Sequence, residues 1–171
     1  MFISTKSQIW ELDLIVAIAI FITVFFIFYT YTSDLADLQN DKMDLLIHDG
    51  RLVSDQLVSA GYPLNWDSDP GNAIFVGLTD GNKRIVPDKV TAAVNDLTYA
   101  ELRKIFGINN DFYAFFLYKD NPTNVDGIFG FGKPGVDQNN ITQREDPEDL
   151  VKIERLLFYD SKIISLEVYV W

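Results

Sequence analysis

The sequence contains no cysteine and only one histidine, His48. The absence of thiols excludes a disulfide framework, a thiolate-bound zinc ion and a cysteine nucleophile. A single histidine gives no basis for a two-histidine metal site or for a serine–histidine relay. We therefore expect no catalytic residues, no metal and no cofactor, and we predict that the protein is not an enzyme.

Basic residues are also scarce, with 14 Lys and Arg against 25 Asp and Glu and a net charge of −11. Such a surface repels the phosphates of nucleic acids, so nucleic acid is not expected as a partner. The 171 residues, 48% of them hydrophobic, suffice for one domain of ordinary size and exclude a disordered chain.

Charged residues are missing altogether from residues 14–33. Twenty uncharged residues match the length that a helix needs to cross about 30 Å of hydrocarbon, and Trp10, Tyr29 and Tyr31 mark its two ends as an aromatic belt would. A buried core helix is the first alternative, but the segment is too long for so small a core. A cleaved secretory signal is the second, but no convincing small-x-small cleavage site follows Tyr31. We expect one membrane-spanning helix, and Lys6 before it favours a cytoplasmic N-terminus and an extracellular remainder.

The helix is expected to continue beyond the membrane over residues 34–60. This segment contains no proline and only one glycine. Apolar or small residues recur in it at helical spacing and form one stripe: Leu46, Gly50, Val53, Leu57 and Ala60. Gly61 is the expected C-terminal cap, and Pro63 prevents continuation. We thus predict one helix over residues 8–60, apolar on all sides in its first half and amphipathic in its second.

Residues 61–171 change to the pattern of an α+β head with a small antiparallel sheet. Two strands around a turn at Asp80-Gly81 are predicted over 74–78 and 83–86. One short helix should follow Pro87, and a second should begin with a capping box formed by Thr98 and Glu101. Further strands are predicted over the aromatic run 111–119 and on both sides of Asp160-Ser161 within 150–171. One face of the last strand is apolar, and the amphipathic half of the long helix is expected to cover it.

The start of the chain, "KSQIWELDLIVAIAIF", resembles the class III signal peptide of archaeal type IV pilin-like proteins. In those proteins a short basic leader ends in a small residue, which is followed by a glutamine directly before the apolar run; here these positions are Lys6, Ser7 and Gln8. "SAGYPLNW", "VGLTDGNKRIV", "LRKIFGINNDFYAFF" and "LEVYVW" are similar to small archaeal pilin-like surface proteins. The resemblance implies a leader over residues 1–7, removed by a prepilin-type peptidase. It also implies a stem over 8–33 that lies in membrane lipid before assembly and then contacts other pilin subunits in a surface filament.

The same resemblance implies a role for two acids at the start of the apolar run, Glu11 and Asp13. Pilins commonly have a glutamate at the fifth mature position. A cut after Ser7 makes Glu11 fourth and Asp13 sixth, whereas a cut after Lys6 makes Glu11 fifth, so the bond and the acid both stay open. An acid buried among stacked stems needs a cation. The new amino terminus of a neighbouring subunit is expected to supply this cation. The ion pair would then set the axial register between subunits, and Glu11 is the favoured acid. The alternative is that both acids only cap the helix, where the dipole favours them.

Three other motifs carry weaker signals. "GFGKPG" over residues 130–135 matches G-x-G-x-x-G, but no helix is expected to start inside it, so we interpret it as a mobile loop. The acids near residues 67–69 and 120–127 lack the required acid of a calcium loop and are interpreted as solvated turns. Asn140 begins the sequon Asn-Ile-Thr and is a candidate N-glycosylation site.

Two functions therefore remain. The first is a structural pilin-like subunit, minor rather than major because its head is strongly charged, in a surface filament or pseudopilus. The alternative is a permanently membrane-anchored extracellular binding domain that does not polymerise. The mature N-terminus separates them, because only the first requires removal of the leader.

Overall fold

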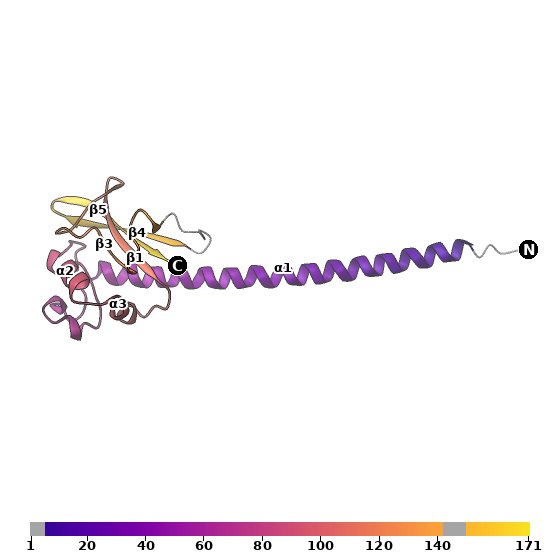
Figure 1. Ribbon diagram of the computed structural model, residues 1–171, viewed down its shortest axis with the longest axis horizontal. Helices are drawn as coiled ribbons and strands as arrows, with labels where there is room; N and C mark the ends of the chain where they lie inside the picture. The colour runs from indigo at the N-terminus through magenta and orange to yellow at the C-terminus, as the bar shows by residue number, and fades with distance from the viewer. Residues whose placement is uncertain (1–5, 142–149) are drawn as a thin grey trace, which may run out of the picture. The chain divides into compact units, whose positions relative to one another are not determined.

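The computed structural model describes the backbone of residues 6–141 and 150–171, and the side chains of 13–32, 42–141 and 150–171 (Figure 1). The chain divides into two compact units, Met1–Lys42 and Met43–Trp171. We call the part of the first helix that lies in the first unit the stem, and the second unit the head. Each unit is described by itself.

Helix α1 runs over Lys6–Val58 and contributes to both units. It confirms the single long helix predicted from the sequence. In the head, Leu46, Val53 and Leu57 of the predicted stripe are buried. A Cβ atom on Gly50 would lie 2.9 Å from Ile153 Cδ1. The absence of a side chain at Gly50 therefore lets the helix approach the sheet closely.

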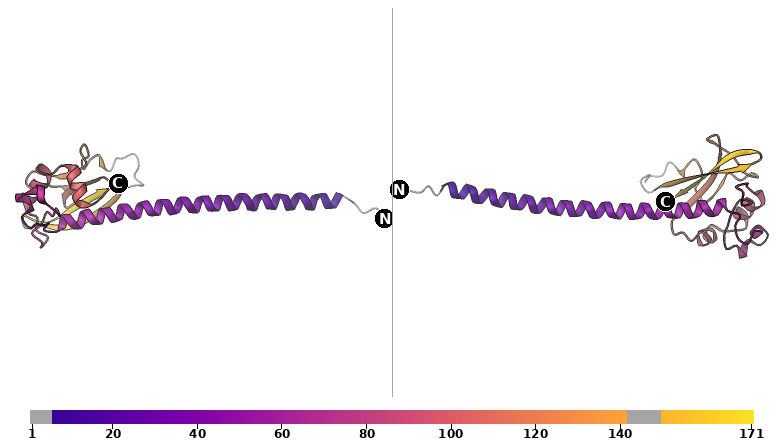
Figure 2. Two further views of the ribbon diagram at one scale, coloured as in Figure 1. Left: turned by 90° about the horizontal axis from the view of Figure 1, so that it is seen from below. Right: turned by 180° about the vertical axis from the view of Figure 1, so that it is seen from behind.

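The head contains one antiparallel sheet with the strand order β2-β1-β5-β4, and β3 pairs with β1 as well. The strands are β1 (Phe112–Tyr118), β2 (Asn121–Pro122), β3 (Gly130–Gly132), β4 (Val151–Tyr159) and β5 (Lys162–Val170). The aromatic strand and the C-terminal hairpin are thus confirmed. Alternate residues of β5 are buried on the face toward α1, namely Ile164, Leu166, Val168 and Val170. Figure 2 shows β4 and β5 alongside the part of α1 that lies in the head.

The other face of the sheet is also partly covered, which the sequence did not indicate. A second apolar cluster consists of Phe115, Leu117, Ile141 and Tyr169. Glu167 lies on this face and is only 5% exposed. Its carboxylate is paired with Lys152 Nζ and accepts a hydrogen bond from the Tyr169 hydroxyl at 3.2 Å. A buried carboxylate is tolerated because these partners replace the water that it has lost.

Two short helices cover the rest of the core, α2 over Pro87–Asn95 and α3 over Tyr99–Phe106. Both were predicted. Helix α3 begins with the expected capping box, in which the Glu101 amide donates to Thr98 Oγ1 at 3.3 Å and the Thr98 amide donates to Glu101 Oε2 at 2.8 Å. It ends at Gly107, which has φ of 72°. Two 3-10 turns, η1 (Trp66–Ser68) and η2 (Pro70–Asn72), lie between α1 and α2.

The hairpin predicted over 74–78 and 83–86 is confirmed only next to its turn. Thr79 and Ile85 form an antiparallel β-bridge, beside which the Val86 amide donates to Leu78 O and the Asp80 amide donates to Arg84 O, both at 2.9 Å, but neither predicted strand forms. The amides of Leu78 and Thr79 donate to the carbonyls of Leu57 and Ser59 at 2.8 and 3.1 Å. The last carbonyls of a helix need donors from outside the helix, and Leu78 supplies one to α1 in place of extending the bridge into a ladder.

The mobile-loop interpretation of residues 130–135 is also wrong, because its first three residues form β3. A Cβ atom on Gly130 would overlap Ala114 O, and one on Gly132, whose φ is 146°, would overlap Phe112 O. The glycines therefore allow β3 to lie close against β1. No helix begins within residues 130–135, so the phosphate-binding geometry of a dinucleotide motif is not present.

Candidate functional site

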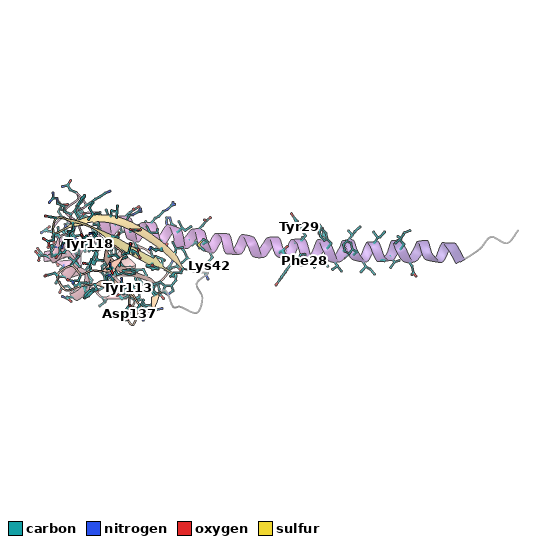
Figure 3. The ribbon with its side chains drawn as sticks, turned by 90° about the horizontal axis from the view of Figure 1, so that it is seen from above. Phe28, Tyr29, Lys42, Tyr113, Tyr118 and Asp137 are labelled. Carbon is teal, nitrogen blue, oxygen red and sulfur yellow. The ribbon has the colours of Figure 1, made fainter. Side chains whose placement is uncertain are left out.

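The stem contains the segment most clearly fitted to an environment other than water. Asp13–Thr32 has a mean hydropathy of 2.5 over 20 residues, and none of it is buried within the protein. By length and composition this segment can be a membrane span or a signal sequence. Figure 3 shows its side chains, Phe28 and Tyr29 among them, projecting from the ribbon without covering.

The threonines of the stem satisfy their own hydroxyl groups. Thr23 Oγ1 donates to Ala19 O at 2.8 Å, and Thr30 Oγ1 donates to Ile27 O at 3.0 Å. Thr32 Oγ1 likewise donates to the carbonyls of the preceding turn at 3.0 Å. Such bonds back to the helix remove the cost of placing a hydroxyl in hydrocarbon. The threonines are therefore compatible with an apolar surrounding on every side.

The residues predicted for processing and register all lie in the first two turns of α1. The helix begins at Lys6 and continues through Ser7, Gln8 and Glu11, whose side chains lie outside the described part of the stem. Asp13 is exposed at the start of the apolar stretch. Residues two positions apart on a helix are separated by about 200° around its axis. Glu11 and Asp13 therefore do not share a face of α1. Their role in register stays a prediction.

Asn140 is exposed and held in a turn. Its Nδ2 donates to Gly135 O at 3.0 Å, and its Oδ1 accepts from the Asp137 amide at 2.8 Å. Ile141 beside it is buried. Thr142 of the sequon lies outside the described residues, and glycosylation at Asn140 stays a prediction.

The head binds the end of α1 through a buried lysine. Lys89 is only 6% exposed, and its Nζ donates to Ala60 O at 2.6 Å and to Thr79 O at 3.1 Å. The Thr79 hydroxyl donates to Val58 O at 2.7 Å. Burial lowers the pKa of Lys89 below its ordinary value, while the negative end of the helix dipole favours a cation at this place. The helix that forms the stem is thus fastened at its other end inside the head.

A second polar cluster surrounds Asp111 at the start of β1. The carboxylate accepts a hydrogen bond from the Tyr99 hydroxyl at 2.8 Å, pairs with Lys133 Nζ at 2.5 Å and lies 3.6 Å from Arg103. Burial raises the pKa of Asp111, but the bonds from Lys133 and Tyr99 outweigh it and hold the pKa below its usual value. Burial and the bond to Asp111 raise the pKa of Tyr99 to about 12. The cluster connects α3, β1 and the turn after β3, so its evident role is structural.

A groove of about 420 Å³ lies at the Val58 end of α1. Leu52, Asp55 and Gln56 form one side of it, and Tyr62 and Phe75 form the other. The sequence did not reveal this groove, because residues 62–75 lie in turns and have no periodic pattern that would indicate which side chains are exposed. Among the described residues no group of three or more His, Asp or Glu side chains could hold a metal ion.

Comparison with known proteins adds no relative. No protein-family model, no curated protein and no solved structure matches the chain. Its function is therefore argued from the stem, the head and the first residues of the sequence.

Proposed function

We propose that this chain is a structural, pilin-like subunit, minor rather than major, of an archaeal type IV pilus-like surface filament or pseudopilus. The stem is stored in the cell membrane with its N-terminus in the cytoplasm and the head outside. After a prepilin-type peptidase removes the leader, the stem packs against the stems of other subunits. The observation that carries this proposal is that one helix, α1, supplies both the apolar stem and a central element of the head core.

The continuity of α1 favours a retained stem over a removable signal sequence. A cut behind Thr32 would sever a helix that runs on to Val58 and buries Leu46, Val53 and Leu57 in the head. A signal sequence that is discarded has no need to continue as a core helix. A stem that remains attached and later meets other stems does need a firm connection to its folded domain.

The acids at the start of the stem fit the same proposal. A carboxylate at the bilayer centre costs roughly 2.5–3.5 kcal/mol on insertion scales, and near the interface it costs much less. Glu11 and Asp13 are therefore tolerated in the lone subunit. In a stack of apolar stems, the amino terminus of Gln8 after a cut behind Ser7 would neutralise one acid of a neighbour, and a shifted neighbour would leave that charge buried and unpaired.

Mass spectrometry of the mature N-terminus in the host tests the proposal directly. We expect a peptide that begins at Gln8, or at Ser7 if the cut follows Lys6, and recovery of the protein in the sheared filament fraction. An intact Met1 together with recovery only from membranes would support the permanently anchored binding domain instead.

Substitution of the two acids tests the register. Glu11→Ala should remove the protein from sheared filaments without changing the melting temperature of the head, because the head core does not include residue 11. Asp13→Ala is the matched variant and should have the smaller effect. If the double variant kept its processing, its partners and its surface display, the register role would be wrong.

A further inference from the structure

Strand β4 forms one edge of the sheet. It stands last in the order β2-β1-β5-β4 and pairs along its whole length with β5 on its inner side. On its outer side, residues 83–85 join it in parallel at a single position. There the Phe158 amide donates to Lys83 O at 2.8 Å, and the Ile85 amide donates to Phe158 O at 2.9 Å. The outer side of β4 therefore already accepts an extended segment at one end.

The bonds of Phe158 show which other backbone groups point outward. Alternate residues of a strand direct their amides and carbonyls to the same edge, so Lys152, Glu154 and Leu156 point theirs outward as Phe158 does. Within residues 6–141 and 150–171, no group is bonded to these amides and carbonyls. We call residues 152–156 the free edge. An edge of this kind can take up a further strand through main-chain hydrogen bonds.

The charged side chains of β4 do not guard the free edge. Charges along an exposed edge commonly block pairing with a further strand. Here Lys152 pairs with Glu167 of β5, and Glu154 Oε1 accepts a hydrogen bond from the Ser165 hydroxyl of β5 at 2.6 Å. The third charged residue, Arg155, binds α1 through an ion pair. Each of these side chains is thus already bonded within the head, and an incoming backbone meets no uncompensated charge.

The opposite edge of the sheet offers much less. Strand β2 contains only Asn121–Pro122, and β3 contains only Gly130–Gly132. Proline has no amide to donate, and short strands at an edge provide few bonds. A further strand therefore gains most at the free edge of β4.

Large apolar side chains are exposed beside the free edge. Phe158 and Ile163 lie directly opposite each other across β4 and β5, and Leu156 is the next residue of β4 on the same face. The three side chains are 48–58% exposed. An added strand would place every second side chain on this face, and an apolar side chain at the right position would cover Leu156.

The turn at the end of the free edge has an excess of positive charge. Asp80 Oδ1 accepts hydrogen bonds from the amides of Asn82 and Arg84 at 2.7 and 3.3 Å, and its charge acts on that of Arg84. Lys83 is exposed and forms no ion pair with a described residue. Residues 83–85 occupy the edge from Phe158 onward, so a strand parallel to β4 must end at this turn. Its terminal carboxylate would then face Lys83.

From these observations we propose that the free edge binds the C-terminal tail of another protein as an added strand. The tail lies parallel to β4, and its main chain bonds to the outward amides and carbonyls of Lys152, Glu154 and Leu156. An apolar side chain of the tail packs on Leu156, and the terminal carboxylate lies at Lys83. The inference goes beyond the proposed function, because this contact needs neither filament assembly nor a second copy of the chain.

Selection from a display library of random seven-residue peptides with free C-termini tests the contact, with the full-length protein in detergent micelles as the target. Enriched peptides should have apolar residues at alternate positions. Amidation of the terminal carboxylate should weaken their binding about tenfold. The joint variant Lys83→Ser and Arg84→Ser should bind the free and amidated forms equally. Absence of enrichment would overturn the proposal, as would enriched peptides that bind wild type equally well after amidation.

N-methylation of single peptide amides shows whether the peptide is bound as a strand. Alternate amides of an added strand face β4. N-methylation should therefore weaken binding by about tenfold or more at every second position and have little effect at the positions between. Binding that shows no such alternation would overturn the proposal.

The substitution Glu154→Pro tests the free edge itself. It removes one outward amide, and edge strands tolerate proline, so peptide binding should be lost while the Tm is kept. If this variant unfolds, hydrogen exchange of the wild-type protein decides, because bound peptide should slow exchange of the Glu154 and Leu156 amides. Unchanged exchange would overturn the proposal. Protection of these amides without peptide, rising with protein concentration, would identify a second copy as the occupant and would overturn it as well.

Discussion

Gly77 allows the head to close over the end of α1, and replacing it by alanine should be costly. A Cβ atom at this position would lie well inside 3.0 Å of Ser59 O and Gly61 N, a separation that real Cβ atoms essentially never show. Both obstacles are backbone atoms and cannot turn aside as a side chain can. The segment that carries Gly77 must therefore move away from the helix.

The magnitude follows from the bonds that this movement breaks. The amides of Leu78 and Thr79 donate to Leu57 O and Ser59 O at 2.8 and 3.1 Å. Each such bond contributes about 1 kcal/mol net, and a buried carbonyl left without a donor costs about 1–3 kcal/mol. We expect Gly77→Ala to lower the free energy of unfolding by about 3 kcal/mol, which for a domain of this size lowers the Tm by about 10 °C.

The assay is thermal unfolding of the full chain in detergent micelles, followed by near-ultraviolet circular dichroism, which reports on the packing of Trp66. Gly71→Ala is the matched control, because the nearest atom to its added Cβ would be Asp69 Oδ1 at 4.0 Å. It should leave the Tm unchanged or raise it by up to about 4 °C, since an unstrained Gly→Ala substitution lowers the entropy of the unfolded chain and stabilises by about 0.4–1 kcal/mol. If the Tm of Gly77→Ala were the same as the Tm of Gly71→Ala, the reasoning would be refuted.

Three further substitutions test other parts of the head. Lys89→Met should lower the free energy of unfolding by about 1–3 kcal/mol in urea titrations, because the carbonyls of Ala60 and Thr79 lose their donor, and exposed Lys104→Met should be neutral. Thr98→Ala should cost about 1 kcal/mol and Thr98→Ser much less, since serine keeps the capping oxygen. Tyr99 has an ordinary pKa of 10.0 and a folded pKa of about 12, so its contribution is complete below pH 10 and disappears as the pH rises to 12. The urea midpoint of Tyr99→Phe should therefore fall less than that of wild type between these two pH values; parallel curves would contradict the assignment.

Patterns that repeat along one element were readable from the sequence. Helix α1 has an apolar run followed by a stripe at helical spacing, and β5 has apolar residues on one face at every second position, Ile164 to Val170, so both were predicted. The capping box of Thr98 and Glu101 is likewise complete within four residues. Each of these signals is local, and no distant part of the chain is needed to interpret it.

Features that depend on distant partners were missed. The run at 74–78 is prone to form a strand, but the Leu78 amide donates to the carbonyl of Leu57 near the end of α1, so no ladder forms. Glu167 falls on the polar side of the β5 pattern, yet it is buried and paired with Lys152. Residues 62–75, which contribute Tyr62 and Phe75 to the groove, have no periodicity at all. Of the candidate site, the stem was predictable because composition alone defines it, whereas the groove was not.

The strand order of the head has a consequence for biogenesis. Strand β5 is made after β1 and β4, yet it lies between them and pairs with both. While the chain is being synthesised, β1 and β4 have no common partner until Lys162–Val170 has left the ribosome. The sheet is therefore completed only after synthesis of its last strand, and a ribosome that stalls before residue 162 leaves β4 without a partner and an unfinished chain for quality-control proteases to remove.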